Sequence, residues 1–174
     1  MTIIVKTKAK TLYFNGLVLP CHIGRRGGVA ARHGREGDEK TPLGAYKLRF
    51  GLYRADRLPR PGLNKNLQNP LNFRALRPDD GWCDAPEHPA YNRFIRTPFN
   101  ASHEILWRED CAYDILLVMD HNDSPPSKGL GSAVFIHIAQ IDGRDTLGCV
   151  ALAPEHMVRL LPFLQKGTIV DIKP

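Results

Sequence analysis

The chain lacks any apolar run long enough to cross a membrane. A membrane-spanning helix needs about 20 consecutive apolar residues, and nothing in the 174 residues approaches that length. Residues 1–8 contain an apolar run too short for the core of a secretory signal peptide, and no cleavage-like pattern follows them. They are typical of a β-strand instead. We therefore expect neither a membrane span nor a visible signal peptide.

Cysteine is scarce, and its spacing contains no metal-binding pattern. The four cysteines are Cys21, Cys83, Cys111 and Cys149, and no two of them form a C-x-x-C pair. This spacing argues against a structural zinc site. If Cys149 is a nucleophile, the other three cannot all pair, so free thiols are the preferred interpretation over a single disulfide.

The sequence also lacks an alternation of basic and aromatic residues, although its formal net charge is +6. A charge of this size suits nucleic acid or another polyanion. However, the lysines and arginines are scattered, and a stacking platform for nucleic acid needs aromatic side chains between them. We expect no nucleic-acid partner. The basic surface is either a solvated surface or one that suits a carboxylate-rich polymer.

The length and the composition, with 43% hydrophobic and 24% charged residues, are typical of one folded domain with its own core. Asn15 and Gly16 predict a type I′ hairpin turn, because both central positions of that turn need positive φ. The sequence predicts a mostly-β domain, built as a curled sheet or sandwich with one or two short helices. The predicted strands cover residues 2–6, 11–14, 17–23, 46–52, 113–119, 133–139 and 168–172.

Residues 53–100 are rich in proline and have few periodic apolar positions. A long loop-rich stretch inside a compact domain is usually functional or an insertion, so we expect an insertion at about 53–110 that flanks a substrate groove. A short helix is predicted over 102–109, with Ser102 as its N-cap. A second helix is predicted to begin at Pro154, because a proline in the first helical position costs no hydrogen bond. Its apolar face would carry Met157, Leu160, Leu161 and Leu164, and Pro162 should end it early.

The strongest chemical signal is a histidine in a strand followed by a glycine–cysteine turn. His137 lies in the apolar segment 135–139, and Cys149 follows Gly148 after a short polar loop. A single cysteine among Val, Ala and Leu is more often a small buried residue, and a single strand histidine is more often a satisfied core residue. Their ordered pairing favours a nucleophilic thiol whose proton is taken by a neighbouring imidazole.

Two segments together resemble the YkuD-type L,D-transpeptidase catalytic domain. Residues 35–46, REGDEKTPLGAY, are similar to the family's GDxxTPxGxF strand entry, and residues 146–150, TLGCV, are similar to its S-H-G-C turn. With the histidine strand, these elements occur in the family's order. The resemblance implies a single catalytic domain over 1–174, with a β-sandwich fold, that acts on peptidoglycan stem peptides. We expect it to use no cofactor and no metal.

The resemblance also implies roles for individual residues. Cys149 would be the nucleophile and His137 the base. Gly148 would hold the sharp turn, whose backbone N–H groups would receive the developing oxyanion. Thr146 occupies the family's Ser/Thr position, where a hydroxyl orients nearby groups. The reaction would be acylation of Cys149 by a donor stem, followed by transfer to an amine of a neighbouring stem.

The sequence departs from the family pattern at Ile138, Leu147 and Ala151, and other residues could compensate. His121 follows the predicted strand 113–119 and is a candidate second catalytic or substrate-facing imidazole, with a surface histidine as the alternative. The neighbouring residues Arg25 and Arg26 could bind a stem carboxylate, with exposed loop charges as the alternative.

Several functions remain open at this point. The cross-link could be of the 3–3 type or an unusual one, and water in place of the amine would give an L,D-carboxypeptidase or endopeptidase. A zinc hydrolase using His121, His137, Cys149 and Asp123 is a further alternative, although the spacing matches no known zinc pattern. A non-catalytic wall-binding module is also an alternative, but the retained Cys/His pair argues against it. The implied substrate indicates the periplasm or cell wall, with cytoplasmic turnover of wall fragments as the alternative.

Overall fold

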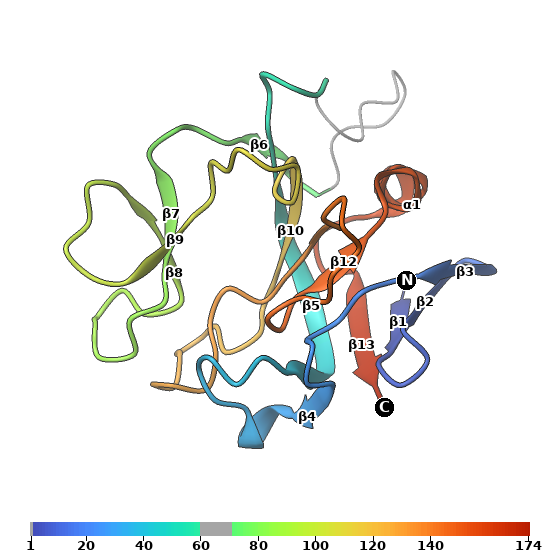
Figure 1. The fold of residues 1–174 in the computed structure, drawn as a ribbon, viewed down its shortest axis with the longest axis horizontal. Helices are drawn as coiled ribbons and strands as arrows, with labels where there is room; N and C mark the ends of the chain where they lie inside the picture. The colour runs from blue at the N-terminus through green and yellow to red at the C-terminus, as the bar shows by residue number, and fades with distance from the viewer. Residues whose placement is uncertain (1, 60–70) are drawn as a thin grey trace.

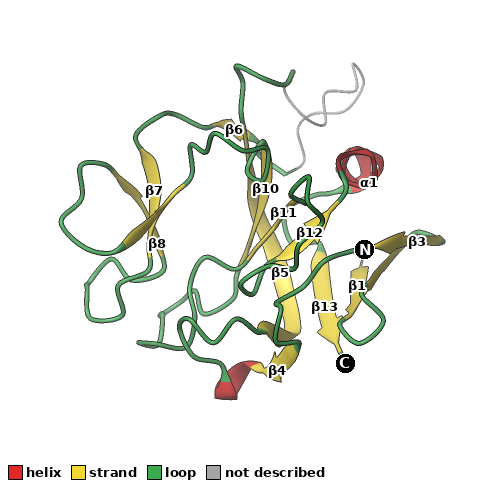
Figure 2. Ribbon diagram, in the orientation of Figure 1, coloured by secondary structure: helices red, strands yellow, loops and turns green. Residues whose placement is uncertain are grey.

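The computed structural model describes residues 2–59 and 71–174, and within these ranges ten strands form one mixed, curled sheet (Figures 1 and 2). In spatial order the strands are β12 (Val150–Leu152), β11 (Phe135–Ile138), β10 (Ile115–Met119), β5 (Thr41–Tyr53), β13 (Ile169–Lys173), β1 (Thr2–Lys6), β2 (Thr11–Phe14) and β3 (Leu17–Pro20). Two short strands, β4 (Gly28–Ala30) and β6 (Arg74–Ala75), also pair with β5. The pairs are antiparallel except where β1 meets β13, where β11 meets β12, and where the two short strands join β5.

The hairpin between β2 and β3 has the predicted turn. Asn15 and Gly16 adopt φ values of 51° and 79°, as a type I′ turn requires. The mostly-β fold class is also confirmed. The expected strand 46–52 begins earlier, at Thr41, so the TPxG segment is itself part of β5.

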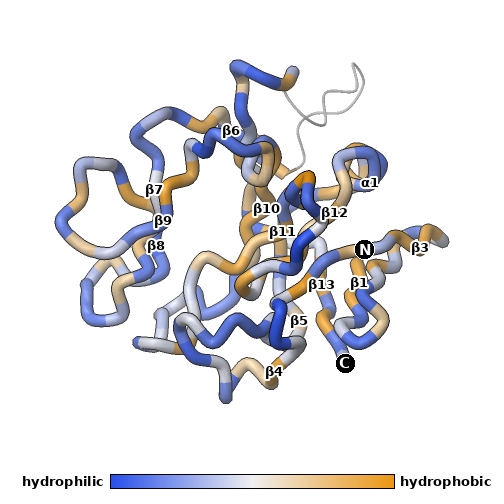
Figure 3. The backbone as a smooth tube through the Cα atoms, in the orientation of Figure 1, coloured by the Kyte–Doolittle hydropathy of each residue, from blue (hydrophilic) through white to orange (hydrophobic). Residues whose placement is uncertain are grey.

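The centre of the sheet separates two hydrophobic cores. Every residue of β10 is buried, as expected for a strand covered on both faces, and Figure 3 shows β10 as largely hydrophobic. Successive strand residues point to opposite faces, so Ile136 and Ile138 enter one core, while Phe135 enters the other. His137 therefore lies on the same face as Phe135.

A separate three-stranded sheet lies beside the large one and covers the Phe135 face (Figure 1). It consists of β7 (Asp80–Cys83), β8 (Arg93–Arg96) and β9 (His103–Ile105). The helix predicted over 102–109 is therefore wrong, and the stretch 53–100 is not loop alone. Because His103 pairs with Cys83, residues 103–105 form a strand although their local sequence favours a helix. Residues 60–70 of the expected insertion lie outside the described residues.

The predicted carboxyl-terminal helix is present as α1 (Pro154–Leu160), with proline at its first position. Met157, Leu160, Leu161 and Leu164 are buried in the core on the Ile136 side of the sheet. The helix ends before Pro162, in the 3₁₀ turn η2 (Leu161–Phe163), and η1 (Ala31–His33) is a second such turn. No helix in the described part of the chain is long and apolar enough to span a membrane.

Replacing Leu117 by alanine should lower the free energy of unfolding by about 2–5 kcal/mol, because it leaves a cavity at a fully buried position of β10. The measurement is chemical denaturation. Val18 is 56% exposed in β3, so Val18→Ala should change that free energy by only about 0.5 kcal/mol. Equal effects of the two substitutions would contradict the two-sided burial of β10.

Candidate active site

A cavity of about 610 Å³ opens on the Phe135 side of the large sheet. It brings together most of the candidate residues identified from the sequence. Arg26 is the exception, since it is not part of the cavity wall. The candidates that line the cavity are Arg25, His121, His137, Thr146, Gly148 and Cys149.

Backbone groups of the segment leading into β11 hold the Cys149 thiol. Cys149 Sγ donates a hydrogen bond to the Ala133 carbonyl at 3.2 Å and accepts one from the Phe135 N–H at 3.3 Å. Burial raises the pKa of Cys149 to about 12, and the charge of Glu104 acts in the same direction, while the Phe135 N–H lowers it. The thiol of the free protein is therefore protonated at neutral pH.

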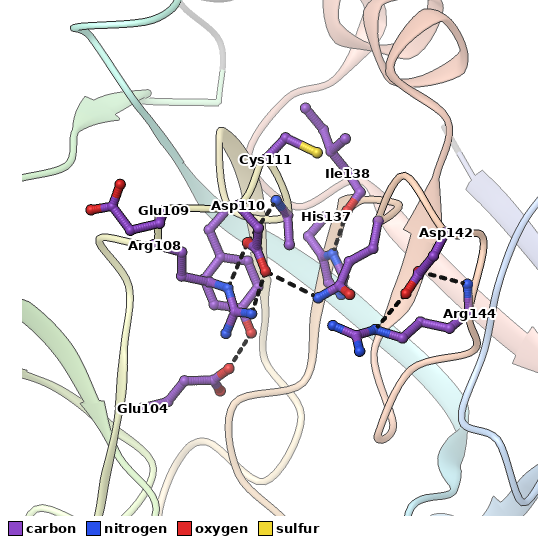
Figure 4. A network of polar contacts seen from close by, with 12 residues as sticks. Glu104, Arg108, Glu109, Asp110, Cys111, His137, Ile138, Asp142 and Arg144 are labelled. Carbon is purple, nitrogen blue, oxygen red and sulfur yellow. Dashed lines mark hydrogen bonds and ion pairs between the residues drawn. The ribbon is translucent and has the colours of Figure 1, made fainter.

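The His137 imidazole is buried and neutral. Its Nδ1 lies 2.8 Å from the Ile138 carbonyl oxygen, as Figure 4 shows. Because a carbonyl only accepts, Nδ1 carries the hydrogen and Nε2 keeps a lone pair. Burial lowers the pKa of His137 to about 4. The residue is thus an unprotonated base at neutral pH, although its low pKa makes it a weak one.

The strand register relates the thiol to the imidazole. Ile136 pairs with Val150 and His137 with Ala151, so Cys149 lies opposite Phe135 and shares its face with His137. The two side chains are offset by two residues, roughly 6–7 Å along the strands. In the described structure, the hydrogen bonds of the thiol and of Nδ1 go to backbone groups rather than to each other. The two groups are therefore a neutral pair that lines one cavity without a hydrogen bond between them in the described structure.

The turn before Cys149 requires glycine at position 148 and is stabilised by hydrogen bonds of the Thr146 hydroxyl. Gly148 has φ +143°, and a Cβ there would lie 3.0 Å from the Lys40 carbonyl oxygen. Thr146 Oγ1 donates to the Cys149 carbonyl at 2.6 Å and accepts from the Gly148 N–H at 3.1 Å. The Gly148 N–H is thus bonded within the turn. The oxyanion role expected of the N–H groups around Gly148 and Cys149 stays a prediction.

The TPxG segment packs against the turn formed by Thr146, Gly148 and Cys149, here called the cysteine turn. Lys40, whose carbonyl contacts Gly148, immediately precedes Thr41 at the start of β5. Thr41 Oγ1 accepts a hydrogen bond from the Gly24 N–H at 2.7 Å, and the next residue's N–H, that of Arg25, donates to the Thr146 carbonyl at 2.9 Å. The two motifs that are far apart in sequence therefore form one unit.

The remaining candidates lie at the edges of the cavity. The Arg25 guanidinium forms an ion pair with Glu39, which raises the pKa of Arg25. His121 is 6% exposed and packs edge-on against Tyr46, with ring centroids 5.3 Å apart. β10 is antiparallel to β11 and pairs Val118 with Phe135, the residue opposite Cys149. His121, three residues after Val118, therefore lies on one side of Cys149, and His137 lies on the other. His121 is buried, and burial lowers its pKa.

A polar network beside His137 was not predicted from the sequence (Figure 4). The Tyr113 hydroxyl donates to the Glu104 carboxylate, and the Tyr113 ring packs edge-on against His137 at 5.3 Å between centroids. Arg108 lies over the Tyr113 ring at 5.1 Å and donates to both Asp110 oxygens, at 2.8 and 2.6 Å. The only sequence signal was their position within the expected insertion or at its end.

The zinc alternative has no support in the geometry. Within residues 2–59 and 71–174, no group of three His, Cys, Asp or Glu side chains is placed to hold a metal ion. Asp123 accepts instead from Arg49 at 2.9 Å and from Arg93 at 3.2 Å. All four cysteines are free thiols, as predicted.

Comparisons with known proteins were made against family models, curated sequences and solved structures. Residues 1–172 match the model of the L,D-transpeptidase catalytic domain, YkuD. No curated protein matches the sequence. Bd1075 of Bdellovibrio bacteriovorus has a similar structure, with a TM-score of 0.50 and 16% identity over 98% of this chain and 46% of that one. At this identity the likeness shows the fold alone.

Two other solved structures align over 99% of this chain with lower scores. L,D-transpeptidase 1 of Mycobacterium tuberculosis has a TM-score of 0.39 and 12% identity, with 61% of its chain covered. The helical cell shape determining protein Pgp2 of Campylobacter jejuni has a TM-score of 0.40 and 16% identity, with 48% covered. This chain thus spans between 46% and 61% of the length of these structures.

The raised pKa of Cys149 predicts the pH dependence of its alkylation. Below a thiol's pKa the thiolate fraction, and with it the alkylation rate, rises about tenfold per pH unit. The iodoacetamide rate at Cys149, followed by peptide mass spectrometry, should therefore still be rising at pH 10. An unfolded peptide containing the same cysteine should level off earlier. A rate that is flat between pH 6 and 8 would indicate a thiolate–imidazolium pair and contradict the neutral pair.

Proposed function

The chain belongs to the YkuD family of L,D-transpeptidase catalytic domains, and we propose that it is a peptidoglycan L,D-transpeptidase in which Cys149 is the nucleophile and His137 the base. The observation that carries this proposal is that the Cys149 thiol and the neutral His137 imidazole, both held by backbone groups, line the same cavity. Stem peptides of peptidoglycan are the substrates, and the periplasm, where that polymer lies, is the proposed location.

In the acylation step, Cys149 Sγ attacks the carbonyl of an amide between an L-centre and a D-centre of the donor stem. His137 Nε2 takes the thiol proton and then gives it to the departing amine as the C–N bond breaks. A thioester on Cys149 remains. Because both groups begin neutral, proton transfer and attack are coupled, and no ion pair has to be maintained in the buried site.

Backbone groups support this step at the sulfur. The Phe135 N–H, 3.3 Å from Sγ, stabilises the negative charge that develops as the proton leaves, since a hydrogen bond to the charged form favours it. The bond from the thiol to the Ala133 carbonyl must break at the same time. Gly148 and Thr146 then act by fixing the turn that presents Cys149.

The other candidates have different proposed roles. His121 is buried in the cavity wall on the far side of Cys149, and its Nδ1 has no hydrogen-bond partner among the described residues. Its place in the cavity wall, away from His137, supports a contact with substrate rather than proton transfer at the sulfur. Arg25 can bind a stem carboxylate only by exchanging its partner Glu39, so its contribution should be small. Arg26 is given no role.

The test is mass spectrometry of defined tetrapeptide and pentapeptide muropeptides after incubation with the protein. Cross-linked dimers should form with the wild type and disappear with Cys149→Ala. His137→Ala should lower the acylation rate by about 10²–10⁴-fold, the range for loss of a general base. Cys111→Ala is the matched control, because Cys111 is a free thiol outside the cavity wall. Its product yield should equal that of the wild type.

Other outcomes of the same experiment are informative. Shortened monomers without dimers would replace transpeptidation by hydrolysis through the same thioester, the carboxypeptidase or endopeptidase alternative. Products that persist in Cys149→Ala would remove the proposed nucleophile. Fragmentation of the dimers identifies the two linked stem residues, and thus distinguishes a 3–3 link from an unusual one.

A further inference from the structure

Glu104 is a carboxylate on the cavity wall that forms no ion pair within the described part of the chain. It belongs to β9, in the small sheet that covers the catalytic face. In the described residues it takes part in no ion pair with Lys, Arg or His. The nearby guanidinium of Arg108 is already bonded to both oxygens of Asp110. The hydroxyl of Tyr113 is the hydrogen-bond donor that holds it.

The surroundings of Glu104 increase its need for a counter-ion. Burial raises the pKa of Glu104, while the Tyr113 hydroxyl and the charge of Arg108 lower it. The charges of Asp84 and Glu36, which line the same cavity, raise it by smaller amounts. Asp84 Oδ1 is itself buried without a hydrogen-bond partner among the described residues. Buried charges in folded proteins are normally paired. This side of the cavity is therefore suited to a ligand that brings a positive charge.

Glu104 is also coupled to the reacting groups. Its carboxylate accepts from the Tyr113 hydroxyl, and the Tyr113 ring packs against His137 at 5.3 Å between centroids. Figure 4 shows Glu104 and His137 within this network. The charge of Glu104 is one of the causes that raise the pKa of Cys149. A cation bound at Glu104 would thus lie in the same cavity as the sulfur that carries the thioester, within its electrostatic reach.

We propose that Glu104 binds the ammonium group of the acceptor stem and takes one proton from it, so that the free amine can attack the thioester on Cys149. This inference rests on the proposed function and adds a catalytic residue for its second half. An amine arrives at neutral pH as an ammonium ion, which has no lone pair for attack. His137 alone removes one proton, whereas aminolysis by an ammonium ion releases two.

The step balances as follows. One ammonium proton passes to the Glu104 carboxylate, and the nitrogen lone pair forms the C–N bond at the thioester carbon. The C–S bond breaks, and its electron pair leaves with Cys149 Sγ. His137 Nε2 takes a second proton from nitrogen and returns it to sulfur. The products are the new amide with its single N–H, the neutral thiol and the neutral carboxylic acid, which then loses its proton to water.

The first test measures cation binding at Glu104 without relying on catalysis. Cys149 is modified with 2-aminoethyl methanethiosulfonate, which carries an ammonium, and separately with uncharged methyl methanethiosulfonate. Glu104→Gln should lower the ratio of the two rates by about threefold or more, because it removes the local negative charge. Glu109→Gln is the matched control, since Glu109 is exposed and outside the cavity wall. An unchanged ratio in Glu104→Gln would overturn the ammonium-binding role.

The second test separates the two halves of the reaction. With a donor stem and an amine acceptor, Glu104→Gln should form the acyl-enzyme at least as fast as the wild type, because it removes a charge that raises the pKa of Cys149. It should lose transfer to the amine by about tenfold or more, as for a general base. Hydroxylamine is uncharged at neutral pH, so its hydroxamate product should be retained. Equal losses of acylation, transfer and hydroxamate would reduce Glu104 to a structural role, and wild-type amine transfer would exclude it as the base.

A wild type that forms no acyl-enzyme would refute the proposed function, while the reagent ratio would still decide whether Glu104 binds an ammonium.

Discussion

The parallel pairing of β11 with β12 positions the two groups that the proposed acylation uses. It places Cys149 opposite Phe135 and His137 opposite Ala151, so that both reactive side chains face one cavity. A register shift of one residue would turn a whole strand over, and the thiol or the imidazole would enter the other core. The contact of Lys40 with Gly148 holds this register from outside the pair, because it fixes where the cysteine turn enters β12.

Burial of that face determines the protonation states. The small sheet of β7, β8 and β9 covers the catalytic face with Trp82 and Leu106, and removal of water disfavours both the thiolate and the imidazolium. The resting site is therefore a neutral pair with low intrinsic reactivity. The same cover brings Glu104 to the cavity. The small sheet thus suppresses the free nucleophile and, in our proposal, supplies the group that selects and activates the amine.

Features with a local cause could be predicted from the sequence. The Asn15–Gly16 turn, the helix that starts at Pro154 and the Cys/His motif each depend on a few neighbouring residues, and the TPxG and GC segments indicated the family. Features that depend on distant pairing could not. Residues 103–105 become a strand only because β7 is beside them, and the bond between Tyr113 and Glu104 requires that strand. Likewise, the pairing of Arg25 with Glu39 depends on how two loops meet.

The most direct measurement for this account is the intact mass of the protein during reaction with a defined donor stem. A transient gain equal to the donor minus its released residue, localised to Cys149 by peptide mapping and removed by hydroxylamine, is the predicted result. It would show that the covered thiol forms a thioester. Product formation without any adduct, or an adduct on another cysteine such as Cys111, would contradict the central role given to Cys149.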